Sequence, residues 1–287
     1  MSQPNQRLAA SVRQRLHNIA EQRGENYNLV LRRYVLERFL YRLGRSPHRS
    51  ALILKGAMLF QVWSKTQIRA TKDMDFLAHG QFDESAFTEI LWDICVADAE
   101  DDAVEFDLSK LEVSDIREDV RYGGLRARFT AVIGGAKIPV QIDLGRGDVV
   151  TPEPTTINYP TLLAMEPPNV LAYPRETVVA EKLEAIVDLR MVNSRLKDYF
   201  DLWFLFTTFV DPPEMLAFAV KRTFAHRGQV IPKEVPVGLS DEFAGDPSKQ
   251  KQWESFVRRA VGEAPGLVEV VRVIREVGMG VFALARE

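Results

Sequence analysis

Two aspartates separated by one residue give this sequence its clearest chemical signal. The run Asp73-Met74-Asp75-Phe76 has the pattern of a β-strand, and because successive strand side chains point to opposite faces, Asp73 and Asp75 share a face about 7 Å apart. Hard divalent cations such as Mg²⁺ take oxygen ligands, usually a few carboxylates together with substrate phosphates. The pair, following a turn at Lys55-Gly56, therefore predicts a pocket for a nucleoside triphosphate and its metal ions.

A third carboxylate is a candidate for the same pocket. Residues 137–143 alternate, so that Ile138 and Ile142 face one way while Gln141 and Asp143 face the other. If this strand lies beside the strand of the two aspartates, three acids converge where two metal ions could bridge an attacking hydroxyl and a departing pyrophosphate. In the alternative interpretation, Asp143 only opens the turn at 144–147.

The elements that must position these acids can be read from hydrophobic periodicity. Helical spacing over 8–19 and 29–43 predicts two helices before the first strand, which spans Ala51–Leu54. A helix over 57–63, a strand over 73–78 and a helix containing Phe87 and Ile94 follow. Alternation from Val104 to Asp143, with a turn at Gly134-Gly135, predicts antiparallel strands. The pattern is that of an α+β lobe with a mixed sheet and flanking helices.

Prolines divide the chain after this lobe. Six of them between 151 and 174 interrupt every periodic pattern, and the remainder is predicted to be mostly helical. Thr177 is a candidate cap for one helix, and a second is predicted near Leu196–Phe206. We therefore expect a bilobed protein, with a metal-binding lobe over 1–150, a proline-rich connection over 151–175 and a helical lobe over 176–287.

Charge is distributed unevenly along the chain, although the net charge is only −3. Between Met1 and Lys55 there are 11 Lys plus Arg against 3 Glu, whereas residues 81–120 hold 14 acidic and 2 basic residues. A basic segment attracts polyphosphates, and an acidic one repels them or docks a basic partner. The arginines of the basic segment could lie on solvated helix faces or contact nucleic acid, and the sequence leaves both readings open. These arginines are Arg13, Arg23, Arg32, Arg33, Arg38, Arg42 and Arg45.

Composition excludes several classes of protein. The 287 residues are 46% hydrophobic and 27% charged, as in ordinary globular proteins. No apolar stretch reaches the roughly 18 residues of a membrane span, and the polar start lacks the apolar centre of a secretory signal, so we expect a cytoplasmic protein. Cys95 is the single cysteine, which excludes an internal disulfide, and the four histidines show no spacing of zinc ligands.

A second charged cluster lies in the helical half. Lys182 and Arg190 are followed by Arg195, Lys197, Asp198 and Asp201, beside strongly apolar positions. The cations could hold phosphates. Alternatively, residues three and four apart lie along one edge of a helix, so the acids could pair with Lys182 or Arg190 of a neighbouring helix.

The ordered set of these motifs resembles a known family nearly end to end. The motifs are Leu54-Lys55-Gly56-Ala57-Met58-Leu59, Arg69-Ala70-Thr71-Lys72-Asp73-Met74-Asp75-Phe76, Ala180-Glu181-Lys182-Leu183-Glu184-Ala185 and Arg195-Leu196-Lys197-Asp198-Tyr199-Phe200-Asp201-Leu202. In these the chain is similar to the AbiEii/AbiGii-type nucleotidyltransferase toxins, a branch of the DNA polymerase beta-like nucleotidyltransferase fold. One departure is Ala57, where the broader fold often carries serine, so one phosphate hydrogen bond would be missing.

The resemblance implies roles for individual residues. It implies catalytic roles for Asp73, Asp75, Lys182 and Asp198, with metal ions on the first two. Asp143 is added as the candidate third metal ligand from the strand pattern described above. Phosphate-binding roles fall to Lys55, Gly56, Ala57, Thr71, Arg190 and Arg195, with Asp143, Lys197 and Asp201 in support.

The resemblance also implies an activity and its partners. Such an enzyme uses Mg²⁺ or Mn²⁺ to transfer a nucleoside monophosphate from a nucleoside triphosphate to an acceptor, with tRNA an expected acceptor. It would be the toxin of a toxin–antitoxin pair of the abortive-infection type, acting in phage defence, with an antitoxin encoded nearby. Two alternatives stay open, namely a small-molecule nucleotidyltransferase of the antibiotic-modifying type and a catalytically silent nucleotide-binding protein.

Overall fold

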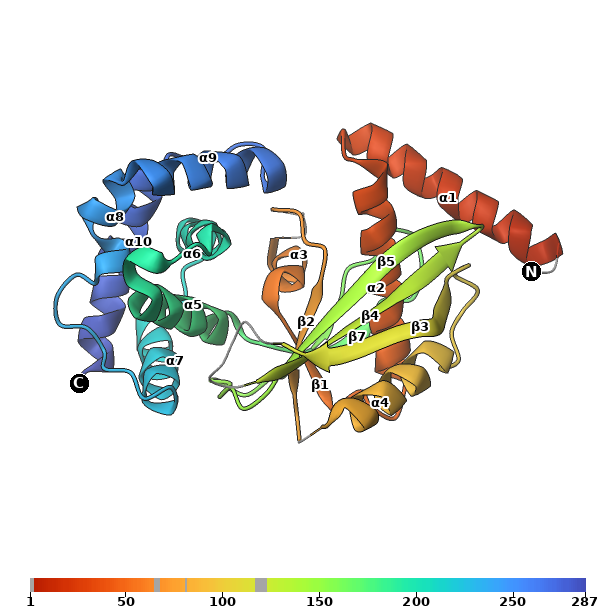
Figure 1. The fold of residues 1–287 in the computed structure, drawn as a ribbon, viewed down its shortest axis with the longest axis horizontal. Coiled ribbons are helices and arrows are strands. Elements are labelled where there is room, and N and C mark those ends of the chain that lie inside the picture. The colour runs from red at the N-terminus through yellow and green to blue at the C-terminus, as the bar shows by residue number, and fades with distance from the viewer. Residues whose placement is uncertain (1–2, 65–67, 81, 117–122) are drawn as a thin grey trace. The chain divides into compact units, whose positions relative to one another are not determined.

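The structure, a computed structural model, describes residues 3–64, 68–80, 82–116 and 123–287 (Figure 1). It divides into two compact units. The first contains Met1–Gly147 and Thr155–Ala172, and the second contains Asp148–Pro154 and Tyr173–Glu287. Each unit is described by itself below.

A seven-stranded sheet organises the first unit, in the order β3-β4-β5-β2-β1-β7-β6. The strands are β1 (Leu52–Lys55), β2 (Met74–Ala78), β3 (Glu105–Asp115), β4 (Gly124–Ile133), β5 (Ala136–Gly145), β6 (Thr155–Asn158) and β7 (Asn169–Ala172). The helices are α1 (Gln3–Arg23), α2 (Tyr27–Arg45), the short 3₁₀ helix η1 (Gly56–Met58), α3 (Leu59–Ser64) and α4 (Glu84–Val96). The expected α+β fold with a mixed sheet is confirmed.

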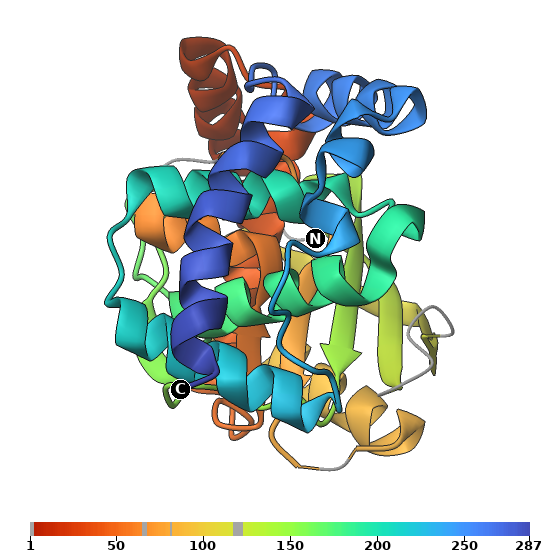
Figure 2. The same ribbon diagram turned by 90° about the vertical axis from the view of Figure 1, so that its left-hand side faces the viewer.

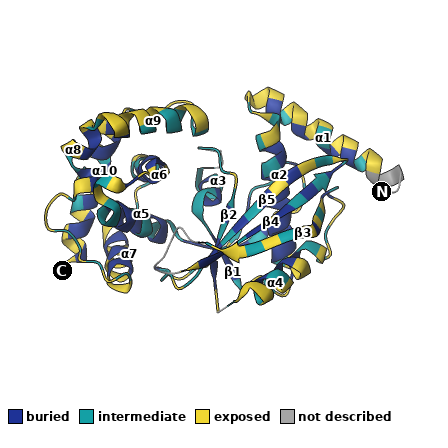
Figure 3. Cartoon of the chain, viewed as in Figure 1, coloured by how far each residue is buried: buried dark blue, intermediate teal, exposed yellow. Residues whose placement is uncertain are grey.

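The two faces of the sheet differ in polarity. Along β4 and β5 buried apolar residues alternate with more exposed polar ones, as Figure 3 shows by colour. Phe39 of α2 packs against Phe106 of β3 and Phe129 of β4, with ring centroids 5.8 and 6.2 Å apart. Helix α2 therefore covers the apolar face, and the other face is left for polar side chains such as Asp143.

The pairing of the central strands departs from a simple meander. Strand β2 pairs antiparallel with β1 and parallel with β5, in a register that sets Asp75 opposite Asp143. Strands β4 and β5 form a hairpin around Gly134-Gly135, as the sequence predicts. Residues 117–122, inside the region predicted to be antiparallel strands, lie outside the described residues.

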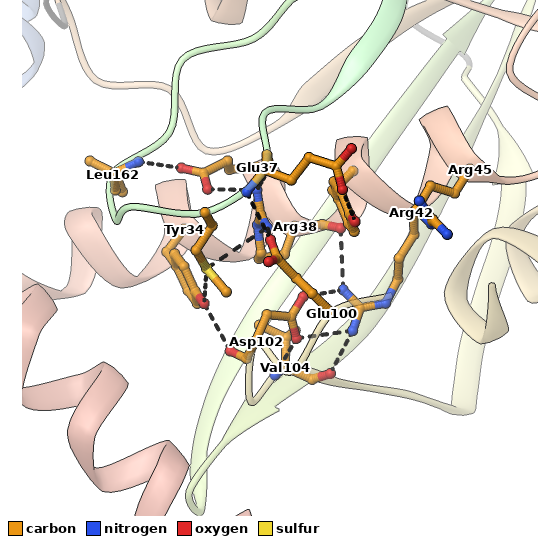
Figure 4. Close-up of polar contacts among 12 residues, drawn as sticks. Tyr34, Glu37, Arg38, Arg42, Arg45, Glu100, Asp102, Val104 and Leu162 are labelled. Carbon is orange, nitrogen blue, oxygen red and sulfur yellow. Dashed lines mark hydrogen bonds and ion pairs between the residues drawn. The ribbon is translucent and has the colours of Figure 1, made fainter. Parts of the chain in front are cut away.

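Two arginines of α2, Arg38 and Arg42, fit neither of the readings left open above, whereas Arg45 is exposed. Arg38 and Arg42 are buried, at 0% and 7% exposure. Figure 4 shows them in a polar network, where Arg38 Nη1 donates to Glu100 Oε1 at 2.8 Å and Arg42 Nη1 donates to Asp102 Oδ2 at 2.7 Å. Buried charges are tolerated when they are paired in this way. These two residues therefore fix the loop before β3 and are unavailable to nucleic acid.

The second unit is helical. Its elements are α5 (Arg175–Leu189), the short η2 (Arg190–Val192), α6 (Leu196–Thr208), α7 (Pro213–His226), η3 (Val237–Leu239), α8 (Asp241–Gly245), α9 (Pro247–Ala260) and α10 (Leu267–Ala285). Figure 2 shows α10 in dark blue, and it contacts α6 and α7. Phe224 and Phe282 meet edge to face, with centroids 5.7 Å apart, in the core between α7 and α10.

Two local predictions need correction. Thr177 does not cap a helix, because α5 begins at Arg175, and the buried Thr177 hydroxyl instead bonds to the backbone N–H and C=O of Thr151. The segment predicted as a connection over 151–175 contains β6 and β7, which join the sheet of the first unit. Across the described ranges, no helix is both long enough and apolar enough to cross a membrane.

Candidate functional site

The acids singled out in the sequence converge in the first unit. Oxygen atoms of Asp73, Asp75 and Asp143, one from each carboxylate, all lie within 4.8 Å of one another. Asp75 and Asp143 are neighbours because β2 and β5 pair in parallel, and Asp73 immediately precedes β2. All three side chains are partly exposed, so an ion could reach them. We call Asp73, Asp75 and Asp143 the acidic triad.

The turn after β1 closely approaches the acidic triad. Gly56 has φ +75°, and a Cβ built on it would lie 2.2 Å from Oδ2 of Asp75 and 2.9 Å from its Cγ. Only glycine fits such a contact and tolerates this backbone conformation. The predicted glycine turn therefore lies directly against Asp75, one of the predicted acids.

A row of four charged residues crosses the sheet at this point. Arg126 of β4 lies opposite Asp143 of β5, and Asp143 lies opposite Asp75 of β2. Asp75 in turn lies opposite Lys55 at the end of β1. In-register side chains on neighbouring strands lie on the same face, about 4.8 Å apart. The two acids at the centre of the row are therefore flanked by one cation on each side.

Arg126 is a site residue that the sequence analysis missed. Its Nε donates to Oδ1 of Asp143 at 2.8 Å and its Nη2 to Oδ2 at 2.7 Å, a bidentate ion pair. A signal for it exists in the sequence, because a two-residue turn fixes hairpin register. Counting back from Gly134-Gly135 sets Arg126 opposite Asp143.

Thr71, predicted to bind phosphate, lies where it orients a carboxylate. Its hydroxyl donates to Oδ1 of Asp73 at 2.8 Å. Ala57 lines a small pocket with Thr71, Arg69 and Tyr159. The predicted phosphate-binding residues of the first unit, Lys55, Gly56, Ala57 and Thr71, are thus gathered around the acidic triad.

The charged cluster of the second unit forms an ion-pair network between α5 and α6. Lys182 pairs with Asp198, and its Nζ lies 2.8 Å from Oδ2 of Asp201. Arg195 Nε lies 3.1 Å from the other oxygen of Asp198. Burial alone would raise the pKa of Asp198, but attraction to Lys182 and Arg195 outweighs it and holds that pKa below its usual value. Asp198 is therefore ionised.

The other cations predicted in this unit lie outside that network. Arg190 and Lys197 are exposed, and Arg190 has φ +46° at the start of η2. The loop that carries Arg195 is held by two contacts, since Asn193 Oδ1 accepts from the Arg195 N–H at 2.8 Å and Lys249 Nζ donates to the Asn193 carbonyl at 2.8 Å. The ion-pair interpretation thus holds for Lys182, Arg195, Asp198 and Asp201. Arg190 and Lys197 face solvent, and phosphate binding by them stays a prediction.

The donor set of the acidic triad suits a hard divalent cation. Three carboxylates within one coordination sphere offer oxygen ligands only, which is the preference of Mg²⁺ and Mn²⁺. The glycine contact at Gly56 brings backbone close to the same point, and a substrate phosphate could complete the coordination there. The residues present therefore fit a metal-assisted site for phosphate chemistry.

Comparisons with known proteins agree with this geometry. The model of the family described as nucleotidyl transferase AbiEii toxin, type IV TA system, matches residues 38–272. Two solved Helicobacter pylori structures have a similar fold, each with a TM-score of 0.52. One, described as a candidate nucleotidyltransferase, is 14% identical, and the match covers 91% of this chain and 96% of that one. The other, JHP933, is 15% identical, with 91% and 93% covered. No curated protein matches the chain.

Proposed function

Because the chain belongs to the AbiEii family of nucleotidyltransferase toxins, we propose that it transfers a nucleoside monophosphate from a nucleoside triphosphate to an RNA acceptor. The enzyme class, a nucleotidyltransferase, follows from the family. The metal, the acceptor and the residue roles are the proposal. The observation that carries it is the acidic triad, held by the pairing of β2 with β5 and contacted by Gly56.

In this proposal the first unit binds the triphosphate and its metal ions. Asp73 and Asp75 are the principal metal ligands, with Asp143 as the third, and the Thr71 hydroxyl orients Asp73. Divalent cations bound there would neutralise phosphate charge and favour ionisation of the attacking hydroxyl. Backbone amides after Gly56, together with Lys55, hold the phosphates. Positioning and charge neutralisation supply most of the rate in such reactions.

The second unit supplies further groups in this proposal. Asp198 is ionised and could accept a proton or orient the acceptor, with Lys182 and Asp201 fixing its position. Phosphate contact falls to the exposed cations Arg190 and Arg195, with Lys197 in support. Lys182 keeps its proposed catalytic role, although its partners in the structure are carboxylates.

The biological setting follows the family. We propose that the acceptor is tRNA, that transfer to it makes the protein toxic, and that an antitoxin encoded nearby restrains it in a type IV toxin–antitoxin system with a role in phage defence. The basic residues of α1 that remain exposed, such as Arg15 and Arg23, are compatible with an RNA substrate because phosphates are attracted to cationic surfaces.

Radiolabel transfer tests the proposal. Purified protein is incubated with Mg²⁺, each α-³²P-labelled nucleoside triphosphate in turn, and total cellular RNA. We expect label on a tRNA-sized band with wild-type protein, and none with Asp73→Asn or Asp75→Asn, because a neutral amide is a poor ligand for Mg²⁺. Asp107→Asn, an exposed aspartate on β3 of the same sheet, is the matched control and should label RNA as wild type does.

Circular dichroism establishes that the Asn variants remain folded. Full activity in those folded variants would contradict the site assignment. Label on protein or on a small molecule, with RNA unlabelled, would contradict the RNA acceptor and leave the enzyme class standing.

A further inference from the structure

Arg126 places a cation against the acidic triad. Both oxygens of Asp143 accept a hydrogen bond from its guanidinium, at 2.8 and 2.7 Å. The amide nitrogen of Gln141 also donates to the same two oxygens, at 3.3 and 3.4 Å. Each oxygen of Asp143 therefore accepts one hydrogen bond from the guanidinium, which leaves further lone pairs on both oxygens. A metal ion that binds Asp143 must share an oxygen with Arg126 or displace one of these hydrogen bonds.

Partial burial strengthens the ion pair between Arg126 and Asp143. The side chains of Arg126 and Asp143 are 21% and 14% exposed, so solvent screens their charges only in part. The three carboxylates carry a formal charge of −3, which Arg126 and Lys55, at the two ends of the row across the sheet, reduce to −1. A divalent cation entering the acidic triad therefore meets a positive charge at the position where it seeks its third ligand, and the two cations repel each other.

Guanidinium groups bind phosphate with the same two-pronged geometry with which they bind carboxylate. An arginine released from Asp143 would remain on β4, beside the acidic triad at which the proposed function puts the triphosphate. It could then pair with phosphate oxygens without any movement of the sheet, because only its side chain must turn.

We propose that Arg126 is an exchangeable counterion of the metal site. It occupies Asp143 in the metal-free protein, gives up at least one Asp143 oxygen when a divalent cation binds, and then contacts the triphosphate. The inference rests on the proposed function, because it takes the acidic triad as the metal site. It adds a substrate-binding role for a residue that no motif contains.

A rival role for Arg126 makes the opposite prediction. If the arginine were only a fixed support that orients Asp143, its removal would leave the carboxylate misplaced, and metal binding would weaken. If it is an exchangeable counterion, its removal abolishes the repulsion and metal binding strengthens. The sign of the change in metal affinity separates the two roles without any measurement of activity.

The first experiment measures Mn²⁺ binding without nucleotide, by isothermal titration calorimetry and by the electron paramagnetic resonance signal of free Mn²⁺. For Arg126→Gln we expect a dissociation constant about tenfold lower than that of wild type, as expected from removal of one partly buried charge. Arg128→Gln is the matched control. Arg128 is two residues along the same strand and on the same face, but it is exposed, so its removal should change the constant at most about twofold.

The second experiment measures binding of inorganic tripolyphosphate at saturating Mn²⁺, which removes any dependence on the base. Here Arg126→Gln should bind about tenfold more weakly than wild type, because the guanidinium is lost from the phosphates. The affinity of Arg126→Lys for tripolyphosphate should lie between those of wild type and Arg126→Gln, since an ammonium keeps the charge but cannot form the two-pronged contact of a guanidinium. An exchangeable counterion thus predicts that Arg126→Gln binds Mn²⁺ more tightly than wild type and tripolyphosphate more weakly.

The outcomes are distinguishable. Weaker or unchanged Mn²⁺ binding in folded Arg126→Gln, with wild type binding Mn²⁺, overturns the role of Arg126 and leaves the proposed metal site standing. Asp143→Asn should weaken Mn²⁺ binding if that site is correct. No Mn²⁺ binding by wild type overturns both proposals. If Arg126→Gln does not fold, as judged by circular dichroism, the same comparison is made with Arg126→Met, which also removes the charge.

Discussion

Gly56 leaves no room for a side chain beside Asp75. A Cβ on Gly56 would lie 2.2 Å from the Oδ2 atom of Asp75, far inside van der Waals contact, and the glycine has φ +75°. The end of β1 and the start of β2 are thus packed so closely that backbone and carboxylate touch. The turn that the sequence predicts to hold phosphates therefore also packs against Asp75, a proposed metal ligand.

We predict that Gly56→Ala moves Asp75 and inactivates the site. The added methyl group must displace the carboxylate or the turn, so nucleotidyl transfer should fall by at least about 100-fold, and Mn²⁺ binding should weaken in parallel. The control is Gly135→Ala, also at positive φ (+84°) but with no atom within 4 Å of the added Cβ. That variant should cost about 1 kcal/mol of stability and keep its activity. A fully active Gly56→Ala variant would refute the role of this contact.

The acidic triad was predictable because it depends on local rules. Strand alternation put Asp73 and Asp75 on one face and Asp143 on the polar face of its own strand. The neighbour relation between Asp75 and Asp143 had to be assumed, since parallel pairing of β2 with β5 brings together residues that are 68 positions apart. Arg126 could have been found by counting from the hairpin turn, but no motif directs attention to it.

The interior of the first unit could not be predicted in the same way. Helix α2 carries Arg38 and Arg42 at positions that helical periodicity cannot distinguish from a solvated face. Their partners, Glu100 and Asp102, are about 60 residues away and belong to an acidic segment whose composition is typical of a protein surface. Burial of such charges is decided by tertiary pairing, which a local pattern does not encode.

We predict that loss of the Arg42 guanidinium destabilises the first unit. Both its terminal nitrogens donate to Asp102, at 2.7 and 3.1 Å, and Asp102 is only 2% exposed. Arg42→Leu leaves that carboxylate buried and unpaired, which should lower the free energy of unfolding by about 3–5 kcal/mol. Urea unfolding followed by circular dichroism measures the change. Arg45→Leu, one turn along and exposed, should change it by less than about 1 kcal/mol, and equal effects of the two substitutions would contradict the prediction.

Glu37 should make stability depend on pH. Burial raises its pKa to about 7, against the opposing effects of Arg38 and the Leu162 N–H, which donates to Oε2 at 2.7 Å. In an unfolded chain its pKa is about 4.3. Between these two values the folded state binds a proton that the unfolded state has lost, so the stability contribution is complete below about pH 4 and is lost as pH rises toward 7.

Glu37→Gln should remove that dependence, because an amide does not ionise and its oxygen can still accept from Leu162. We expect the fall in unfolding free energy between pH 5 and pH 7, measured with urea, to be smaller in this variant than in wild type by about 1–3 kcal/mol. Glu105→Gln, at an exposed carboxyl on β3, should keep the wild-type difference. The same pH slope in Glu37→Gln and wild type would show that Glu37 is ionised in the fold.

The last prediction concerns Lys182, whose ammonium forms ion pairs with two buried carboxylates. Asp198 and Asp201 are 3% and 0% exposed and share this one ammonium. Lys182→Met leaves both of them buried without their common cation, so the second unit should lose about 3–5 kcal/mol of stability. Lys197→Met, on the same helix as the acids but exposed, should change stability by no more than about 0.5 kcal/mol.

The pH dependence of these variants identifies the ionised partner. Because the folded pKa of Asp198 lies below its unfolded value of about 3.9, its stabilising contribution is present above about pH 4 and is lost as pH falls through the folded value. Without Lys182 that pKa rises, so acid unfolding should begin at a higher pH. Adding Asp198→Asn to Lys182→Met should return the onset toward lower pH, because the uncompensated charge is gone. Identical acid onsets in wild type and Lys182→Met would mean that this ion pair does not hold Asp198 ionised.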